Sequence, residues 1–227
     1  MTPFLDAVLL PSCCACNTLA VLVDVADCKV QLCATCASLV QPKLQQVPLL
    51  DLSQRFACFE YSGPIVSLLS KAKDEAFCSQ YYALQKMFVA AAGPLISEIA
   101  EKHSVVITQV PEAWHRKVKG WYLPAAMARN VARLTKVKYR TLLRRRRQVV
   151  KQASLGAVER RLNLKNCFAP QRILFNRNRS QQVVIVIDDV STTGASLAEA
   201  AHCLEAMGYL KVVAISLAIA PLRMREC

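Results

Sequence analysis

The distribution of apolar and polar residues after residue 54 alternates between two periods. Apolar residues three or four positions apart predict helices over 65–73, 79–101, 123–134, 154–163 and 195–207. Short apolar runs predict strands over 56–61, 105–110, 183–187 and 212–219. Gly93 and Pro94 lie inside the second helical segment and are expected to kink or divide it. Strands that alternate with helices predict an α/β fold in which helices cover both faces of a parallel sheet.

The first 45 residues carry cysteines instead of this periodicity. Four of them form two C-x2-C pairs with sixteen residues between: Cys13, Cys16, Cys33 and Cys36. Two such pairs can complete the tetrahedral thiolate set of a structural zinc ion, and the spacer fits a short β-hairpin. Cys14 and Cys28 are surplus, so either can replace one of the four ligands, and six unrelated thiols are the alternative. We therefore expect a zinc-binding module over 1–45 and a second domain over 54–227, and we interpret residues 40–53, which contain Pro42 and Pro48, as a linker.

Composition narrows the class of protein. The apolar content of 54% is ample for a packed core. No uninterrupted apolar run reaches the ~18 residues of a membrane span, and the N-terminus lacks the basic region of a signal peptide. Eleven cysteines, an odd number, fit a secreted disulfide framework poorly. We expect a cytoplasmic protein with metal-bound thiols and no membrane span.

The sequence VVIVIDDVSTTGASLAEA, residues 183–200, joins a predicted strand to a predicted helix. Ligands of open α/β sheets bind at the carboxyl ends of strands, where Asp188 and Asp189 are expected. Their carboxylates can accept hydrogen bonds from the vicinal hydroxyls of a sugar. The small residues that follow can bring backbone amides and hydroxyls around a phosphate at a helix N-terminus: Ser191, Thr192, Thr193, Gly194, Ala195 and Ser196. The stretch predicts a ribose 5-phosphate site, and a capped turn without a ligand is the alternative.

The positive charge of the chain is concentrated in one region. Residues 115–179 hold 19 Lys and Arg and a single acidic residue, Glu159, although the whole chain carries only +13. The densest part is Arg144, Arg145, Arg146, Arg147 and Lys151, and Trp114, Trp121, Tyr122 and Tyr139 lie among or beside the basic residues. Cations interleaved with aromatic rings suit single-stranded nucleic acid, which needs backbone neutralisation and base stacking. A solvated basic face, with the aromatic residues in ordinary packing, is the alternative.

Several motifs resemble known families. Residues 183–200 resemble the phosphoribosyl diphosphate (PRPP) signature of type I phosphoribosyltransferases, in which apolar residues precede two aspartates, a variable pair and Thr-Thr-Gly. Nearly the whole chain resembles the ComF family of competence-associated phosphoribosyltransferase-like proteins, which have a zinc module where the cysteine tetrad lies. The further matching residues are Val110-Pro111 with Arg116 and Lys119-Gly120-Trp121-Tyr122, then Arg145, Arg147 and Gln152, then Leu155, Arg160, Asn163 and Phe168.

The resemblance implies a type I phosphoribosyltransferase-like parallel sheet flanked by helices, with a small four-cysteine zinc ribbon before it. It implies that PRPP binds with Mg²⁺, that Asp188 and Asp189 orient the ribose and have the catalytic role, and that Arg116 and Lys119 neutralise the pyrophosphate. The ComF resemblance also implies a role in DNA uptake, with single-stranded DNA as a partner. Competence proteins are possible further partners under this resemblance. The alternative is an active PRPP-dependent phosphoribosyltransferase of nucleotide metabolism.

The chain departs from the ComF pattern at four positions. Where the family has an arginine and an asparagine, this chain has Lys119 and Tyr122. Where the family has two threonines, it has Val149 and Ser196. Lysine keeps the positive charge but lacks the planar fork that binds phosphate oxygens in pairs. The resemblance therefore implies phosphate binding more directly than it implies turnover.

Overall fold

The computed structural model describes residues 12–19, 21, 23–25, 28–40, 42, 44–47, 54–75, 77–112, 120–146, 164–171 and 179–220. The predicted helix over 154–163 lies outside these residues, and so do Arg116, Lys119, Arg147 and Lys151. Within them, no helix is long and apolar enough to cross a membrane.

A six-stranded sheet forms the centre of the molecule, with the order β3-β4-β10-β9-β5-β6. Five strands are parallel: β4 (Arg55–Glu60), β10 (Lys211–Ile219), β9 (Gln182–Ser191), β5 (Ser104–Gln109) and β6 (Lys138–Tyr139). The short edge strand β3 (Gln45–Gln46) pairs antiparallel with β4. The central strands read as continuous Val/Ile/Ala runs because helices or a hairpin cover both of their faces.

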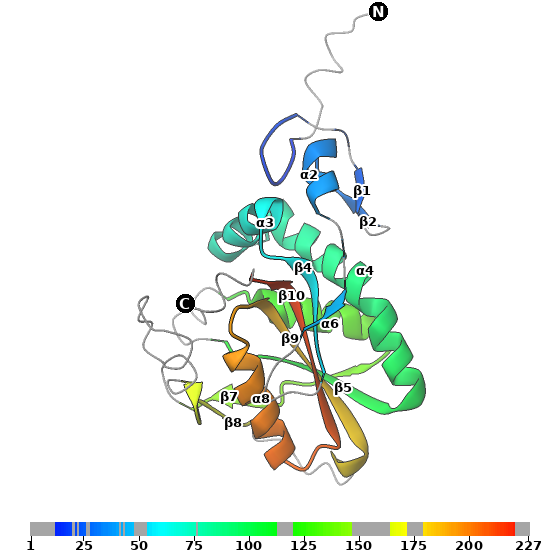
Figure 1. Ribbon diagram of the computed structural model, residues 1–227, viewed down its shortest axis with the longest axis vertical. Helices are drawn as coiled ribbons and strands as arrows, with labels where there is room; N and C mark the ends of the chain where they lie inside the picture. Colours follow the sequence, from blue (N-terminus) through cyan, green and yellow to red (C-terminus); the bar gives the residue numbers. More distant parts are fainter. Residues whose placement is uncertain are drawn as a thin grey trace, which may run out of the picture.

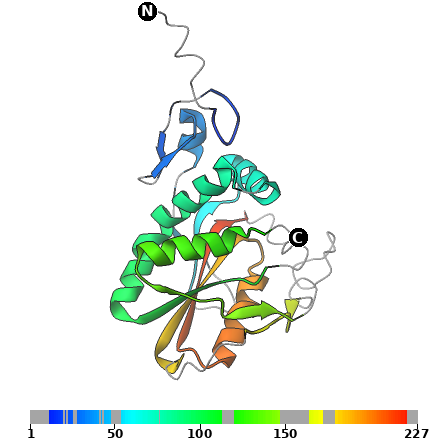
Figure 2. The ribbon, with the colours of Figure 1, turned by 180° about the vertical axis from the view of Figure 1, so that it is seen from behind.

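The two faces of the sheet are covered by different elements (Figures 1 and 2). Three helices pack on one face, against residues such as Ile185 and Ile187: α3 (Gly63–Asp74), α4 (Ser79–Lys102) and α6 (Leu123–Leu134). The opposite face, with Val184 and Val186, packs against α8 (Ala195–Ala206) and the hairpin of β7 (Leu143–Arg145) and β8 (Phe168–Pro170). A short 3-10 helix, η1 (Arg179–Gln181), precedes β9. Alternate residues of one strand therefore belong to two separate cores.

The cysteine-containing segment forms a small module beside α3 and α4 (Figure 1). It consists of β1 (Val23–Val25), which pairs antiparallel with β2 (Cys28–Val30), and α2 (Ala34–Leu39). Two side chains fasten it to the helices. Gln80 Nε2 of α4 donates to the Cys14 carbonyl at 2.9 Å, and Lys71 Nζ of α3 donates to Asn17 Oδ1 at 3.0 Å. The module thus packs against the same core as the parallel sheet.

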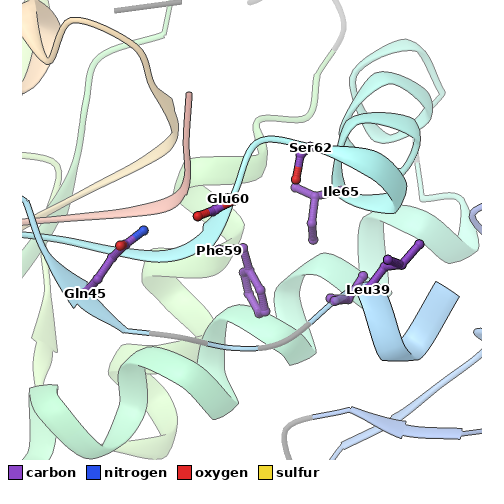
Figure 3. Close-up of a pocket in the computed structure, with 7 residues that line it drawn as sticks. Leu39, Gln45, Phe59, Glu60, Ser62 and Ile65 are labelled. Atoms are coloured by element: carbon purple, nitrogen blue, oxygen red, sulfur yellow. The ribbon is translucent and has the colours of Figure 1, made fainter. Parts of the chain in front are cut away.

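A cavity of about 190 Å³ lies where this module meets the sheet (Figure 3). It is lined by Leu39, Val40, Gln45, Phe59, Glu60, Ser62 and Ile65. These residues come from α2, β3, the end of β4 and the start of α3. The cavity therefore lies at the N-terminal end of α3, whereas Lys73, at the other end of that helix, contacts Asp189.

The α/β prediction with a parallel sheet flanked by helices is confirmed, and most element boundaries agree within one or two residues. The expected division at Gly93 and Pro94 is wrong, because α4 runs unbroken from Ser79 to Lys102 with Pro94 inside it. Buried side chains on both sides of the proline, such as Ala92 and Ile96, hold the helix against the core and offset the missing hydrogen bond. The segment interpreted as a linker contains β3.

Candidate functional site

Asp188 and Asp189 lie within the last four residues of β9, at the edge of the sheet where the carboxyl ends of the parallel strands meet. The strand extends to Ser191, four residues beyond the predicted end, so the two acids belong to it. Asp188 is 7% exposed and Asp189 is 9% exposed. Two adjacent carboxylates at such burial repel one another and lose hydration, so they require compensating partners.

Those partners come from the backbone and from α3. Asp188 Oδ1 accepts a hydrogen bond from the Asp189 amide at 2.9 Å, and Asp189 Oδ1 accepts one from the Val190 amide at 2.7 Å. Lys73 Nζ lies 2.8 Å from Asp189 Oδ2. Burial raises the pKa of the Asp188 carboxyl well above its usual range, and the nearby Asp189 charge adds to the rise, while the amide hydrogen bond and Lys73 oppose it. Full ionisation of the pair is therefore harder than that of two free carboxylates.

The loop between β9 and α8 leaves several backbone amides exposed to a ligand. Gly194 has φ +79° and ψ +1°, the left-handed conformation that glycine adopts without strain, and it is the residue before the first turn of α8. In the described part of the chain, no protein atom accepts a hydrogen bond from the amides of Thr192, Thr193, Gly194, Ser196 and Leu197. These amides surround the N-terminus of a twelve-residue helix, where the helix dipole favours an anion.

The side chains of the loop have mixed roles. Thr193 Oγ1 accepts a hydrogen bond from the Ala195 amide at 3.4 Å, so it is engaged by the first residue of α8. The Ser191 hydroxyl accepts a buried hydrogen bond from the Arg55 guanidinium and is already engaged within the protein. Thr192 and Ser196 are half-buried, and their hydroxyls bond to no protein atom among the described residues. Thr192 and Ser196, with the amides, are therefore the groups that can receive an anion.

The structure brings the four cysteines of the two C-x2-C pairs together. The Sγ atoms of Cys13, Cys16, Cys33 and Cys36 all lie within 4.8 Å of one another, and Cys16 Sγ lies 3.7 Å from Cys33 Sγ. Tetrahedral zinc thiolates with Zn–S of about 2.3 Å have sulfurs just under ~4 Å apart, so the four residues fit a zinc ion. The Cys36 amide donates to Cys33 Sγ at 3.4 Å. Cys14 is buried beside the cluster but does not belong to it, and the side chain of Cys28 is outside the described part.

Part of the basic region borders a separate cavity of about 400 Å³ at the carboxyl ends of β5 and β6. Arg144 and Arg145 line it together with Trp121, Tyr122 and Tyr139, which the sequence placed beside the basic residues. Arg146 is exposed on the same hairpin but does not line the cavity. The lining also includes Arg129 of α6, which the sequence analysis did not single out.

Sequence reasoning also missed Lys73. A lysine in the last turn of an amphipathic helix is ordinary, because cations favour helix C-termini. Nothing in the spacing of apolar residues along α3 indicates that the C-terminal end of this helix contacts β9. The available signal was the presence of two adjacent carboxylates at a predicted buried strand end, because such a pair requires a cation from somewhere in the fold.

No protein-family model and no curated protein matches the chain. Among solved structures it is similar to a purine phosphoribosyltransferase from Pyrococcus horikoshii Ot3, with TM-score 0.39 and 15% identity over 62% of this chain and 76% of that one. An adenine phosphoribosyltransferase gives TM-score 0.38 and 13% identity over 62% and 72%. An alanine mutant from an analysis of an invariant aspartic acid in HPRTs gives 0.38 and 10% over 65% and 72%. These TM-scores and identities do not assign a function to this chain. A function has to be inferred from the residues of the site itself.

Proposed function

We propose that this chain binds PRPP, or a related ribose 5-phosphate ligand, in the loop between β9 and α8. The observation that carries the proposal is the pairing of two features at one strand end. The carboxylates of Asp188 and Asp189 lie near the end of β9. The loop that follows them has five amides without a protein partner among the described residues. The amides suit the phosphate, and the carboxylates suit the ribose diol.

The 5-phosphate is proposed to lie at the start of α8. Its oxygens would accept from the amides of Thr192, Thr193 and Gly194, and from the hydroxyls of Thr192 and Ser196. The left-handed Gly194 lets the chain turn without a side chain between the amides and the anion. The helix dipole contributes typically ~0.3–1 kcal/mol to binding of an anion at such a position.

The two carboxylates would then orient the ribose. Mg²⁺ suits this position, because carboxylate and phosphate oxygens are its preferred ligands and it usually keeps substrate oxygens in its shell. When bound, it would screen the diphosphate charge. Asp188 accepts hydrogen bonds from the hydroxyls most strongly as a carboxylate, and Lys73 must loosen its contact with Asp189 as the ligand enters. Arg116 and Lys119 are proposed to contact the pyrophosphate.

The ComF resemblance extends the proposal to DNA uptake. In this interpretation the basic segment of Arg144, Arg145, Arg146, Arg147 and Lys151 neutralises the backbone of single-stranded DNA. Zinc on the four cysteines stabilises the N-terminal module, since a segment of this size gains much of its folding free energy from the metal. An active phosphoribosyltransferase is the alternative, and release of pyrophosphate with a nitrogen base as acceptor would distinguish it.

Calorimetry with Mg-PRPP tests the proposed ligand. The wild type is expected to bind, and Asp188→Ala with Asp189→Ala is expected to lose at least tenfold in affinity, since two hydrogen-bonding carboxylates are removed. Glu205→Gln, an exposed acid at the far end of α8, is the matched control and should bind as the wild type does. Wild-type protein that binds no Mg-PRPP contradicts the proposal.

A gel shift on single-stranded DNA tests the uptake role. Contacts to phosphates release counterions, so the logarithm of affinity should fall linearly with the logarithm of salt concentration. Affinity that does not change with salt, or no complex at low salt, removes DNA handling from the proposal but leaves the PRPP site in place.

A further inference from the structure

The cavity between β5, α6, β6 and β7 has the charge of an anion site. Three arginines, Arg129, Arg144 and Arg145, line it against a single carboxylate, Glu112. None of the three forms an ion pair with a described acidic residue. Guanidinium groups that line a concave site and form no ion pair with a protein carboxylate are suited to bind phosphate oxygens in pairs.

Two of the arginines are held in place through atoms that a ligand does not need. Arg145 Nε donates to the Pro111 carbonyl at 3.3 Å, and its guanidinium carbon lies 5.3 Å from the centre of the Phe168 ring. Arg144 Nε donates to the Pro170 carbonyl at 3.3 Å. In both cases the terminal nitrogens have no protein acceptor among the described residues, so they can bind a ligand without breaking these contacts.

The same cavity presents aromatic rings. Tyr139 is fixed by its hydroxyl, which donates to Gln109 Oε1 at 3.0 Å, and Arg129 lies over its ring at 5.9 Å. Trp121 is half-buried in the lining. An aromatic ring with a guanidinium over it can stack on a planar base. The volume of about 400 Å³ falls within the ~300–1,000 Å³ range of small-molecule sites.

The cavity is separate from the loop proposed to hold the 5-phosphate, and Gly120 and Trp121, which follow the proposed pyrophosphate contact Lys119, are part of its lining. β5 pairs directly with β9, and the Val110 amide donates to the Ile187 carbonyl at 3.0 Å, just before the two aspartates. The cavity opens at the end of β5 and beyond it toward β6, on the side away from β10. A ligand there would be held beside the ribose site along the same edge of the sheet.

We propose that this cavity binds one nucleotide, with its phosphate on Arg144 and Arg145 and its base against Trp121 and Tyr139, next to Arg129. The nucleotide comes either from a free nucleoside monophosphate or from a unit of a single strand. The proposal deepens the suggested handling of DNA, and it rests on that function only for the strand as the source. It does not depend on binding of PRPP.

Titration calorimetry on the full chain tests the site with four probes: thymidine 5′-monophosphate, thymidine, inorganic phosphate and a short oligothymidylate. The wild type should bind the monophosphate more tightly than either of its parts. Arg129→Gln and Arg144→Gln should each weaken binding of the monophosphate, the oligothymidylate or both about tenfold, the usual cost of one charged hydrogen bond. Arg133→Gln, exposed one turn along α6 and outside the cavity, is the control and should not weaken either.

The pattern of losses identifies the source. Weaker monophosphate binding assigns a free nucleotide, weaker oligothymidylate binding assigns a strand, and either result supports the site. The proposal is overturned if the wild type binds neither probe, or if both cavity variants, shown to be folded by circular dichroism, bind both probes as the Arg133→Gln protein does. A parallel titration with Mg-PRPP keeps the two proposals apart, since its failure would contradict the ribose site alone.

Discussion

The contact between Lys73 and Asp189 sets the charge of the candidate site before any ligand arrives. Lys73 Nζ lies 2.8 Å from a carboxylate that shares a buried strand end with a second one. A divalent ion that approaches the same oxygens meets both the attraction of the acids and the repulsion of the lysine. The lysine is therefore expected to weaken binding of a bare cation, whereas a ligand with its own negative charge can displace it from Asp189.

Replacement of Lys73 should separate these two effects. Lys73→Met is expected to bind Mn²⁺ about two- to fivefold more tightly at the two aspartates, because a partly exposed ion pair contributes at most ~1 kcal/mol. It should bind Mg-PRPP no more tightly, since the diphosphate loses a cation. Lys71→Met, two residues earlier on α3 and bonded to Asn17, is the control. Electron paramagnetic resonance of Mn²⁺ measures the effect, and equal Mn²⁺ affinity in both variants contradicts this role of Lys73.

The raised pKa of Asp188 predicts the direction in which the stability of the protein changes with pH. The folded protein holds this proton at pH values where the unfolded chain, with an Asp pKa of about 3.9, has lost it. The free energy of unfolding should therefore fall as the pH rises from about 4 toward the folded pKa. Asp188→Asn lacks this loss, so its stability relative to the wild type should increase with pH in urea unfolding. A constant difference across that range would show that Asp188 ionises normally.

At the scale of elements, the loop before α8 depends on one backbone conformation. Gly194 has φ +79°, where a Cβ costs roughly 1–2 kcal/mol. Gly194→Ala should lower the free energy of unfolding by about that amount and should also displace the amides, so Mg-PRPP binding is lost. Gly208, which follows α8 at φ +85°, provides the matched control. Gly208→Ala should show the same loss of stability in urea titrations but wild-type binding, and equal binding by the two variants would contradict the role of the loop amides.

Helices and strands in which apolar residues recur at regular spacing could be predicted from the sequence. Strands that exist only because a distant strand pairs with them could not. The helix over 123–134 and the strand 212–219 follow from apolar spacing, because one face or both faces of each are buried. β3 and β6 contain two residues each and exist only because β4 and β5 offer partners. β9 continues through two aspartates, which disfavour strands, because β10 pairs with it as far as Ser191.

The candidate site was predictable to a similar degree. The order of aspartates, small hydroxyl residues and glycine located the loop, since each residue type acts through its immediate neighbours. The cysteine spacing located the four-cysteine cluster for the same reason. Lys73 and Arg129 enter their sites from other helices, and only the packing of α3 and α6 on the sheet brings them there.

At the scale of the whole molecule, the cysteine module shares a core with the parallel sheet. Val30 and Leu32 of the module belong to the same cluster of buried residues as Leu68 and Leu84 of α3 and α4. Loss of order in the module would therefore expose apolar surface on both helices. This arrangement predicts that the metal stabilises more than the segment that binds it.

Metal removal should make this coupling visible. We expect elemental analysis to find about one zinc ion per chain. Cys33→Ser should lose this ion, and the melting temperature of the whole protein should fall by several degrees. A loss of 1 kcal/mol lowers the melting temperature by ~4–8 °C in a small domain and by less in a larger one. Cys203→Ser, at a half-buried thiol on α8 remote from the cluster, should keep the ion and the melting temperature. Zinc at full occupancy in Cys33→Ser would contradict the ligand assignment.

A crystal structure of the chain grown with Mg-PRPP tests the proposed ribose 5-phosphate site most directly. We expect the 5-phosphate within hydrogen-bonding distance of the amides of Thr192, Thr193 and Gly194, with the ribose hydroxyls on Asp188 and Asp189. A loop without ligand at saturating concentration, or amides that bond to other protein atoms in the crystal, would contradict it.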